Sequence, residues 1–342
     1  MAISIARILS QLRIPIPVSM GGTGSTTPDA ARAALLVAGR NRVINGNAAI
    51  AQRVSIVCSN NVGGYGGPDR FVAGNLSAGG QFTQSWSTIV DDGITKNCAL
   101  QTVNSSVADL ATNKYWSGFN YLIEGNDCYD LKGKPVVVSF LFKASIAGTY
   151  SFALQDGSAT YSYVTTFTVA ANVVTKISIP LSTITNSATI PQSHLTGMKI
   201  WIGTLNNATY STSTLNTWIS GNYITTPNMT VWALTVGATI AVTELQLEVG
   251  TVATQFERIP YADELIRCQR YYETVTGTVS ASHGPYIHRP YKVTKRIVPS
   301  VLVVSGSVSG ANIESSTVGT FRTGGVLPSS DADFTISANA EL

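Results

Sequence analysis

The chain has 342 residues, a length typical of two or three domains rather than one. Charged residues make up 12%, far below the usual share of about 25%, while mean hydropathy is +0.17. This excludes an intrinsically disordered chain, which combines low hydrophobicity with high charge. The net charge is +3, and the basic residues are scattered. Because nucleic-acid binders concentrate Lys and Arg on one face or helix, we expect no nucleic-acid partner.

The first predicted element is a short helix from Ile3 to Ile14, which Pro15 and Pro17 end. Its apolar residues have the i, i+3, i+4, i+7 spacing of one helical face: Ile5, Ile8, Leu9 and Leu12. A free helix of about a dozen residues is marginally stable in water. We therefore expect this stripe to dock, either on its own domain or on copies of the chain or another structure.

A glycine-rich loop and a second short helix, over 30–36, are predicted next. Thr27 suits the N-cap and Pro28 the first helical position. Such a loop can hold phosphate at a helix N-terminus. However, no strand precedes it and no Gly-Lys-Ser/Thr pattern is present, so we expect no nucleotide site.

Residues 41–258 are predicted to form a β-sandwich of the jelly-roll type, because runs of β-branched and aromatic residues alternate with turn signals such as Asp156-Gly157. The predicted strands are 136–142, 149–155, 162–170, 173–181, 198–205 and 243–249. The apolar stretch 229–242 is too short to cross a bilayer and is interpreted as two strands around a turn. Trp201 and Trp232 lie in apolar runs and are expected in the core. No membrane insertion is expected.

The pattern changes after residue 258. Apolar residues at helical spacing, with acidic residues early and basic residues late, predict a linking helix within 259–273. Strands return at 298–306 and 333–338, so residues 274–342 are predicted to form a smaller C-terminal β-domain. The chain is therefore expected to be mostly β, with residues 1–40 as a helical attachment segment.

Seven stretches carry a resemblance to a known family. In chain order they are GGTGSTTPDAARAAL (21–35), NRVINGNAAIAQR (41–53), GPDRF (67–71), LKGKPVVVSFLFKAS (131–145), TELQLEVGTVATQFERIPYADELIRCQRYYE (243–273), residues 291–300 and DADFTISANAEL (331–342). They resemble the GGTG module, the jelly-roll module and the small C-terminal β-domain of tailed-bacteriophage tail fibres. The match is collinear, and residues 146–242 match only in β character. The resemblance implies a homotrimer on the virion, made in the host cytoplasm, whose N-terminus binds other phage structural proteins.

The sequence contains no clear catalytic constellation. The G-x-S-x-G motif of esterases is absent. The three histidines, His194, His283 and His288, lie in loop-like sequence. Glycoside hydrolysis needs two carboxylates, and the candidates on composition alone are Asp91, Asp92, Glu124, Asp127 and Asp130. Asp91-Asp92-Gly93 is more typical of a turn, so we expect no enzymatic activity.

The cysteines give no metal signature. Cys58, Cys98, Cys128 and Cys268 are far apart and form no C-x-x-C pair. Zinc sites need clustered Cys and His ligands. We expect buried free thiols, with one disulfide as the alternative, and no cofactor or metal.

Two sets of residues are candidates for receptor contact, with core packing as the alternative for each member. Trp and Tyr rings stack on apolar sugar faces and carry a polar tip. The aromatic residues in Asn-, Ser- and Gly-rich sequence are Trp86, Trp116, Tyr121, Tyr129, Trp218 and Tyr223. The second set lies in the loop 280–291, since loops on rigid scaffolds often bind partners: His283, Tyr286, His288, Arg289 and Tyr291.

These observations and the resemblance lead to one expectation. The chain is expected to be a non-enzymatic phage virion protein, a tail fibre or receptor-binding protein that attaches the particle to host surface glycan. A structural particle component without a receptor role, such as a head fibre, collar or adaptor protein, is the alternative. A polysaccharide-degrading tailspike is a third.

Overall fold

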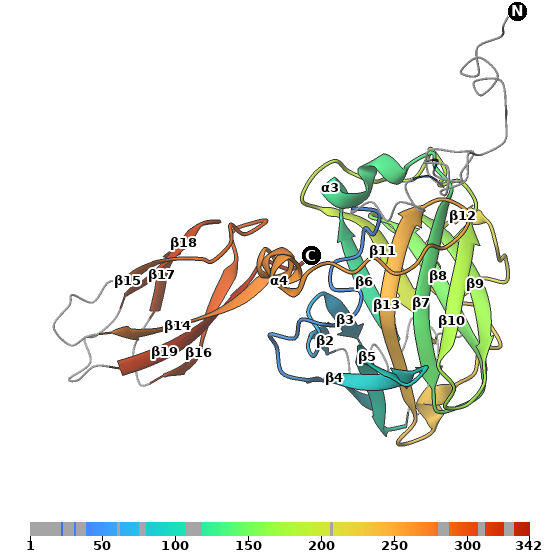
Figure 1. Ribbon diagram of the computed structural model, residues 1–342, viewed down its shortest axis with the longest axis horizontal. Coiled ribbons are helices and arrows are strands. Elements are labelled where there is room, and N and C mark those ends of the chain that lie inside the picture. The colour runs from blue at the N-terminus through green and yellow to red at the C-terminus, as the bar shows by residue number, and fades with distance from the viewer. Residues whose placement is uncertain are drawn as a thin grey trace, which may run out of the picture.

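The computed structural model describes residues 39–59, 62–74, 80–106, 118–205, 208–279, 287–306, 312–324 and 332–342, together with Gly22 and Ala31. These residues form a β-sandwich with a smaller β unit beside it (Figure 1). The mostly β fold is therefore confirmed. The predicted N-terminal helix, with Ile5, Ile8, Leu9 and Leu12, lies outside the described residues. So does the helix predicted over 30–36, apart from the helical Ala31.

One layer of the sandwich is a six-stranded sheet in the order β1-β4-β5-β13-β7-β10. Its strands are β1 (Ile56–Ser59), β4 (Gln81–Asp91), β5 (Ile94–Ser105), β7 (Val136–Ala144), β10 (Thr175–Leu181) and β13 (Thr239–Val249). β13, the last of these in sequence, lies between β5 and β7 and pairs antiparallel with both. Eight of its eleven residues are buried, five of them apolar and three polar, namely Thr243, Gln246 and Glu248.

The other layer is a seven-stranded sheet in the order β12-β9-β8-β11-β6-β3-β2. Its strands are β2 (Gly63–Tyr65), β3 (Phe71–Gly74), β6 (Phe119–Glu124), β8 (Gly148–Asp156), β9 (Tyr161–Val169), β11 (Thr196–Ile202) and β12 (Trp218–Ser220). All six predicted strands of the sandwich coincide with observed strands, β7 to β11 and β13. Alternation and short apolar runs were therefore sufficient to locate them.

The core between the layers is rich in edge-to-face aromatic pairs. Phe142 lies 5.0 Å from Phe167 between ring centroids, with an interplanar angle of 81°. Phe140 contacts Phe167 at 5.5 Å and 77°. Such arrangements are favourable beyond the area that they bury. Trp232 is 0% exposed and lies in this core, and Trp201, 9% exposed, is buried in a separate apolar cluster with Ala153, Val164 and Ile224, so both are buried as expected.

The interpretation of residues 229–242 as two strands is wrong. Trp232–Leu234 form a 3-10 helix, η3, and strand structure begins only at Thr239 in β13. The Trp232 indole N–H donates to the carbonyl of Gly203 at 3.0 Å. The hydrogen bond from the buried Trp232 ring to a loop carbonyl favours a turn at this position. Apolar periodicity alone does not distinguish such a turn from a strand.

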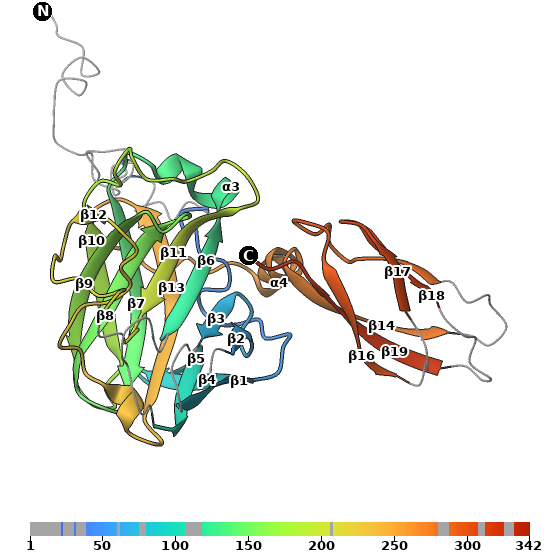
Figure 2. The same cartoon turned by 180° about the vertical axis from the view of Figure 1, so that it is seen from behind.

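The smaller unit follows the predicted helix, which the structure places at α4 (Tyr261–Gln269). One three-stranded sheet contains β14 (Tyr272–Val279), β16 (Ser300–Gly306) and β19 (Ala332–Asn339), and another contains β15 (Ile287–Pro290), β17 (Asn312–Ser316) and β18 (Thr320–Gly324). They enclose a small core that includes Phe334, Ile336 and Phe321. Figure 2 shows this unit projecting from one side of the sandwich, with α4 between the two.

The four cysteines are free and buried, as expected. Burial raises the pKa of Cys58 and of Cys98 to about 12. Within the described part of the chain, no helix is long and apolar enough to span a bilayer.

Candidate functional site

The segment after residue 40 folds into a turn that Asn45 organises. Asn45 has a left-handed backbone, with φ of 59°, which Asn tolerates better than most residues. Its side-chain amide donates to the carbonyls of Ile50 and Asp69 at 2.8 and 2.9 Å, and its oxygen accepts from the Ile50 N–H. A Cβ on the adjacent Gly46 would lie 2.1 Å from the Leu245 carbonyl oxygen. The Asn-Gly pair therefore brings residues 41–53 against β13 and the loop before β3.

That loop carries Asp69 and Arg70, both of which are buried where the sandwich meets the smaller unit. Gln52 donates to Asp69 from both its backbone, at 3.0 Å, and its side chain, at 2.5 Å. The same Gln52 amide donates to the carbonyl of Tyr272 at 2.9 Å. Gln52 therefore ties the sandwich to the first residue of β14.

The end of α4 is attached to the sandwich by a carboxylate. Glu124, at the end of β6, accepts two hydrogen bonds from the Arg270 guanidinium, at 2.9 and 3.0 Å, and one from the Tyr271 hydroxyl at 2.7 Å. Glu124 is 1% exposed. A two-pronged Arg–carboxylate contact constrains orientation as well as distance.

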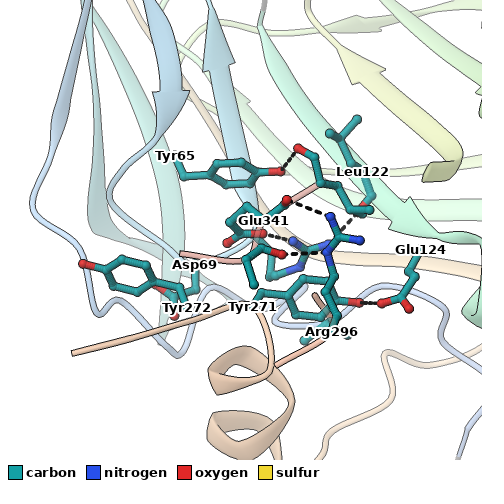
Figure 3. A network of polar contacts seen from close by, with 12 residues as sticks. Tyr65, Asp69, Leu122, Glu124, Tyr271, Tyr272, Arg296 and Glu341 are labelled. Atoms are coloured by element: carbon teal, nitrogen blue, oxygen red, sulfur yellow. Dashed lines mark hydrogen bonds and ion pairs between the residues drawn. The ribbon is translucent and has the colours of Figure 1, made fainter. Parts of the chain in front are cut away.

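The last residues of the chain return from β19 to the sandwich, as Figure 3 shows. Glu341 pairs with Arg53 at 3.1 Å and with Arg70. The Leu342 carbonyl accepts from the Tyr65 hydroxyl at 3.2 Å.

Arg296 donates to the carbonyls of Ala340 and Glu341 at 2.6 and 2.8 Å, and also to the carbonyl of His194 in the sandwich.

We call this network the joint. It comprises Gln52, Arg53, Asp69, Arg70, Glu124, Arg270, Tyr271, Tyr272, Arg296 and Glu341. Two arginines from the sandwich stack on consecutive tyrosines that follow α4. The guanidinium carbon of Arg53 lies 3.5 Å from the Tyr272 ring centroid, and that of Arg70 lies 3.6 Å from the Tyr271 centroid. Desolvated cation–π contacts of this kind contribute about 2 kcal/mol.

Burial governs the electrostatics of the joint. It raises the pKa of Asp69 even though Arg53 opposes the shift. It also raises the pKa of Asp127, where the Glu124 charge acts in the same direction. Burial by itself would lower the pKa of Arg70, but the Glu341 carboxylate and the neighbouring Tyr121, Tyr271 and Tyr65 together outweigh it, and the pKa rises. Arg70 therefore stays charged in a buried site.

A buried ion network with this geometry fixes one relative orientation of two bodies. Removing water from charges is costly, so such pairs persist where donors and acceptors match closely, and breaking one partner is strongly destabilising. Here both bodies supply donors and acceptors: Arg53 and Arg70 of the sandwich pair with Glu341, whereas Arg270 and Arg296 donate to Glu124 and to the His194 carbonyl of the sandwich. The joint is therefore suited to holding the smaller unit at a set angle.

Four of the five candidate catalytic carboxylates are engaged in ion pairs or turns, and Asp127 accepts a hydrogen bond from the Tyr271 hydroxyl at 3.5 Å. Asp91 pairs with Lys96 at 2.8 Å, and Asp92 has the left-handed φ of a turn residue, 47°. Asp130 pairs with Arg42 at 2.8 Å. Among the described residues, no group of three His, Cys, Asp or Glu side chains is placed to hold a metal ion.

The predicted sugar-contact residues are not gathered in one site. Tyr121 is 2% exposed, and its hydroxyl bonds both the N–H and the carbonyl of Ile44, so its assignment to a sugar-binding surface is corrected to a core role.

Trp218 contacts the sandwich core and Tyr163, whereas Tyr223 packs with Trp201 in a separate apolar cluster. Trp86 and Tyr129 are exposed, at 46% and 41%. Trp116 lies outside the described residues.

The predicted receptor loop is only partly described. Tyr291 is 6% exposed and stacks on Phe321 at 5.6 Å, so its assignment to receptor contact is corrected to the core of the smaller unit. Arg289 is exposed on β15. His288 pairs through its backbone with Arg322 in β18. His283 and Tyr286 lie outside the described residues.

Sequence reasoning did not identify the joint as a site. Apart from Glu124, its members lie in the stretches 41–53, 67–71, 243–273, 291–300 and 331–342, which carried the family resemblance, but contacts such as Gln52 with Tyr272 and Arg70 with Glu341 span more than 200 positions. The sequence signal that could have indicated the joint is the presence of several charged residues within stretches that are otherwise neutral or apolar.

Fold and joint together define a class: a β-sandwich to which a second β unit is held by buried ion pairs. No family model matches the chain, and no curated protein matches it. Among solved structures, a CBM4 module is 14% identical over 60% of this chain and 98% of its own, with a TM-score of 0.31. The family 22 carbohydrate binding module of Clostridium thermocellum Xyn10B is 15% identical over 54% of this chain and 89% of its own, with a TM-score of 0.30.

A third similar structure is the enzymatically active domain of bacteriophage CBA120 tailspike protein 4. It is 10% identical over 61% of this chain and 21% of its own, with a TM-score of 0.31. Scores of this size do not establish a common topology. The function is therefore argued from the chain's own residues.

Proposed function

We propose that the chain is a non-enzymatic virion protein of a tailed bacteriophage, a tail fibre or receptor-binding protein that attaches the particle to host surface glycan. One observation carries the proposal. Five of the seven stretches that resemble phage-fibre modules meet in the joint: Gln52 and Arg53 lie in 41–53, Asp69 and Arg70 in 67–71, Arg270 to Tyr272 in 243–273, Arg296 in 291–300 and Glu341 in 331–342. Matches scattered along the sequence thus become one structural unit, which supports a shared architecture rather than chance similarity.

The joint also suits the proposed role. An attachment protein must present its contact surfaces in a fixed direction from the particle. The joint has three independent contacts: Glu124 with Arg270, Glu341 with two arginines, and Arg296 with the His194 carbonyl. Together they resist bending of the smaller unit against the sandwich in several directions. In a homotrimer anchored by its N-termini to other virion proteins, three weak sites in fixed positions would gain strongly through avidity.

The carboxylates support a non-enzymatic role. Glycoside hydrolysis needs a carboxylic acid and a carboxylate flanking an open substrate position. Glu124 is saturated by Arg270 and Tyr271, and Asp91 and Asp130 are held by lysine or arginine. We expect purified protein to release no reducing ends from host polysaccharide.

Two measurements test the proposal. Gold-labelled antibody against the chain, applied to intact particles in electron microscopy, should mark the tail tip or a fibre. Purified full-length chain should compete with particles for adsorption to host cells. Labelling at the head or collar without competition would favour the structural alternative. Release of reducing ends would contradict the non-enzymatic proposal.

A further inference from the structure

The β4–β5 hairpin has one exposed face made of neutral side chains. In the antiparallel register Trp86 lies opposite Ala99, Thr88 opposite Asn97, and Val90 opposite Thr95. Directly opposed residues lie on the same face of a sheet. We call the open part of this set the hairpin face: Trp86, Thr88, Val90, Thr95 and Asn97. Ala99, opposite Trp86, is 0% exposed and belongs to the core of the sandwich. Figure 1 shows β4 at the end of the sandwich remote from α3 (Gly125–Cys128).

Four members of this face are exposed. Trp86 is 46% and Val90 60% exposed, and Thr88 and Thr95 are also exposed. Ile89 and Cys98, on the opposite face of the same hairpin, are 5% and 0% exposed. Two of the hairpin's exposed large apolar side chains, Trp86 and Val90, are thus on the hairpin face, and Ile94, 60% exposed next to the turn, is on the other. A soluble sheet would normally place its apolar residues on the covered side.

The Trp86 ring is held in place. Its indole N–H donates to the carbonyl of Ala48 at 3.0 Å, which uses the ring's one polar group and leaves the apolar ring partly open. A Cβ added to Gly67 would lie 2.9 Å from the Trp86 backbone nitrogen, so the loop that contains Gly67 packs closely against the strand at Trp86. A ring ordered in advance loses little side-chain entropy when a ligand stacks on it.

The charges of the hairpin are kept off this face. Lys96 is opposite Ile89 in the register and so lies on the other face. There it pairs with Asp91 at 2.8 Å and with Glu244 at 3.3 Å. A face without charges favours a neutral ligand, because an ionic ligand would lose its water there without gaining an oppositely charged partner.

We infer that the hairpin face binds a neutral pyranose of a surface polysaccharide; this inference rests on the proposed glycan-binding function. The apolar face of the sugar ring stacks on Trp86. The sugar hydroxyls hydrogen-bond to the amide of Asn97 and to the hydroxyls of Thr88 and Thr95. A second copy of the chain is the competing occupant, but stable self-interfaces have a more continuous apolar centre than this alternation of apolar and hydroxyl groups.

The test is binding of the full-length chain to an array of purified bacterial O-polysaccharides and capsular polysaccharides. We expect Trp86→Ala to weaken binding at least tenfold, and Trp86→Phe, which keeps a stacking ring, to retain most of it. Thr88→Val replaces only the hydroxyl of an exposed residue and should weaken binding a few-fold without affecting folding. Tyr261→Ala removes an aromatic side chain that is 63% exposed on α4 and serves as the matched control, with no change expected.

The outcomes separate the two proposals. If wild type binds a polysaccharide and Trp86→Ala and Thr88→Val bind it equally well, the hairpin face is wrong and the glycan function stands. If wild type binds none of the array and fails to compete for host cells, both are wrong. If sedimentation shows that Trp86→Ala dissociates an oligomer while glycan binding persists, the face is an interface between copies and the inference is overturned.

Discussion

The guanidinium of Arg70 lies on the ring of Tyr271, and through this contact a loop of the sandwich meets the residue that links α4 to β14. Arg70 has a left-handed backbone, with φ of 74°, and is 1% exposed. A strained backbone is kept only where its surroundings compensate for it. Here the compensation is the Glu341 carboxylate, the Leu122 carbonyl and the Tyr271 ring.

Glu341→Ala should lower the free energy of unfolding by about 3–5 kcal/mol, because it leaves Arg53 and Arg70 buried without their carboxylate. Urea unfolding followed by fluorescence measures this. Arg258→Ala is the control: it breaks an exposed pair with Glu244 and should cost at most about 1 kcal/mol. A loss below 1 kcal/mol for Glu341→Ala would mean that the joint is not a stabilising network.

A chain that ends at Asn339 should unfold in two separate calorimetric transitions, where the full chain shows one. Removal of residues 340–342 deletes the Ala340 and Glu341 carbonyls that Arg296 contacts, together with the Glu341 carboxylate. The sandwich and the smaller unit keep their own cores. A chain that lacks only Leu342 keeps the Glu341 contacts and should retain a single transition. One transition in both variants would show that α4 alone couples the two units.

The fold could be predicted much further from the sequence than the joint. Strands such as 136–142 depend on local alternation, which is visible within a few residues. The joint depends on pairs such as Gln52 with Tyr272 and Arg70 with Glu341, whose separation in sequence hides them. Local composition also led to the wrong predictions that Tyr121 contacts sugar and that Tyr291 contacts a receptor. Both lie in polar sequence, but their rings are buried because the opposing strand or sheet covers them.

The four cysteines should not react with a thiol reagent at pH 8 while the chain is folded. Burial holds the pKa of Cys58 and of Cys98 at about 12, so almost no thiolate is present and access is blocked. Absorbance with a chromogenic disulfide should show no release in buffer and four equivalents in denaturant. Rapid reaction of even one thiol in buffer would show local opening around that cysteine.

Lys295 should make stability rise with pH above about 8. Burial lowers its pKa to about 8, and Glu273, 3.4 Å away, only partly opposes this. An unfolded lysine titrates near 10.4. Between these values the unfolded chain binds a proton that the folded chain lacks, so the free energy of unfolding increases with pH, by at most about 1.4 kcal/mol per pH unit.

The matched variant is Lys295→Met combined with Glu273→Gln, which leaves no unpaired charge. The cysteines titrate equally in both proteins, so the difference in unfolding free energy between pH 7.5 and 9.5 isolates the pair. Wild type should gain stability relative to the double variant across this range. Parallel curves would contradict the lowered pKa.

Deletion of residues 1–20 should abolish attachment to the particle and leave the described β structure intact. The described sandwich begins at Gly39 and Asn41, whose N–H groups donate to the Glu257 carboxylate, and neither contact involves the deleted segment. The midpoint of thermal unfolding should therefore change little. Reconstitution with particles that lack the protein measures attachment, because the apolar stripe of Ile5, Ile8, Leu9 and Leu12 is then missing. Sedimentation of both forms shows whether the full chain forms the proposed trimer and whether the same stripe holds it together. Full occupancy of particles by the truncated chain would place the attachment surface on the sandwich instead.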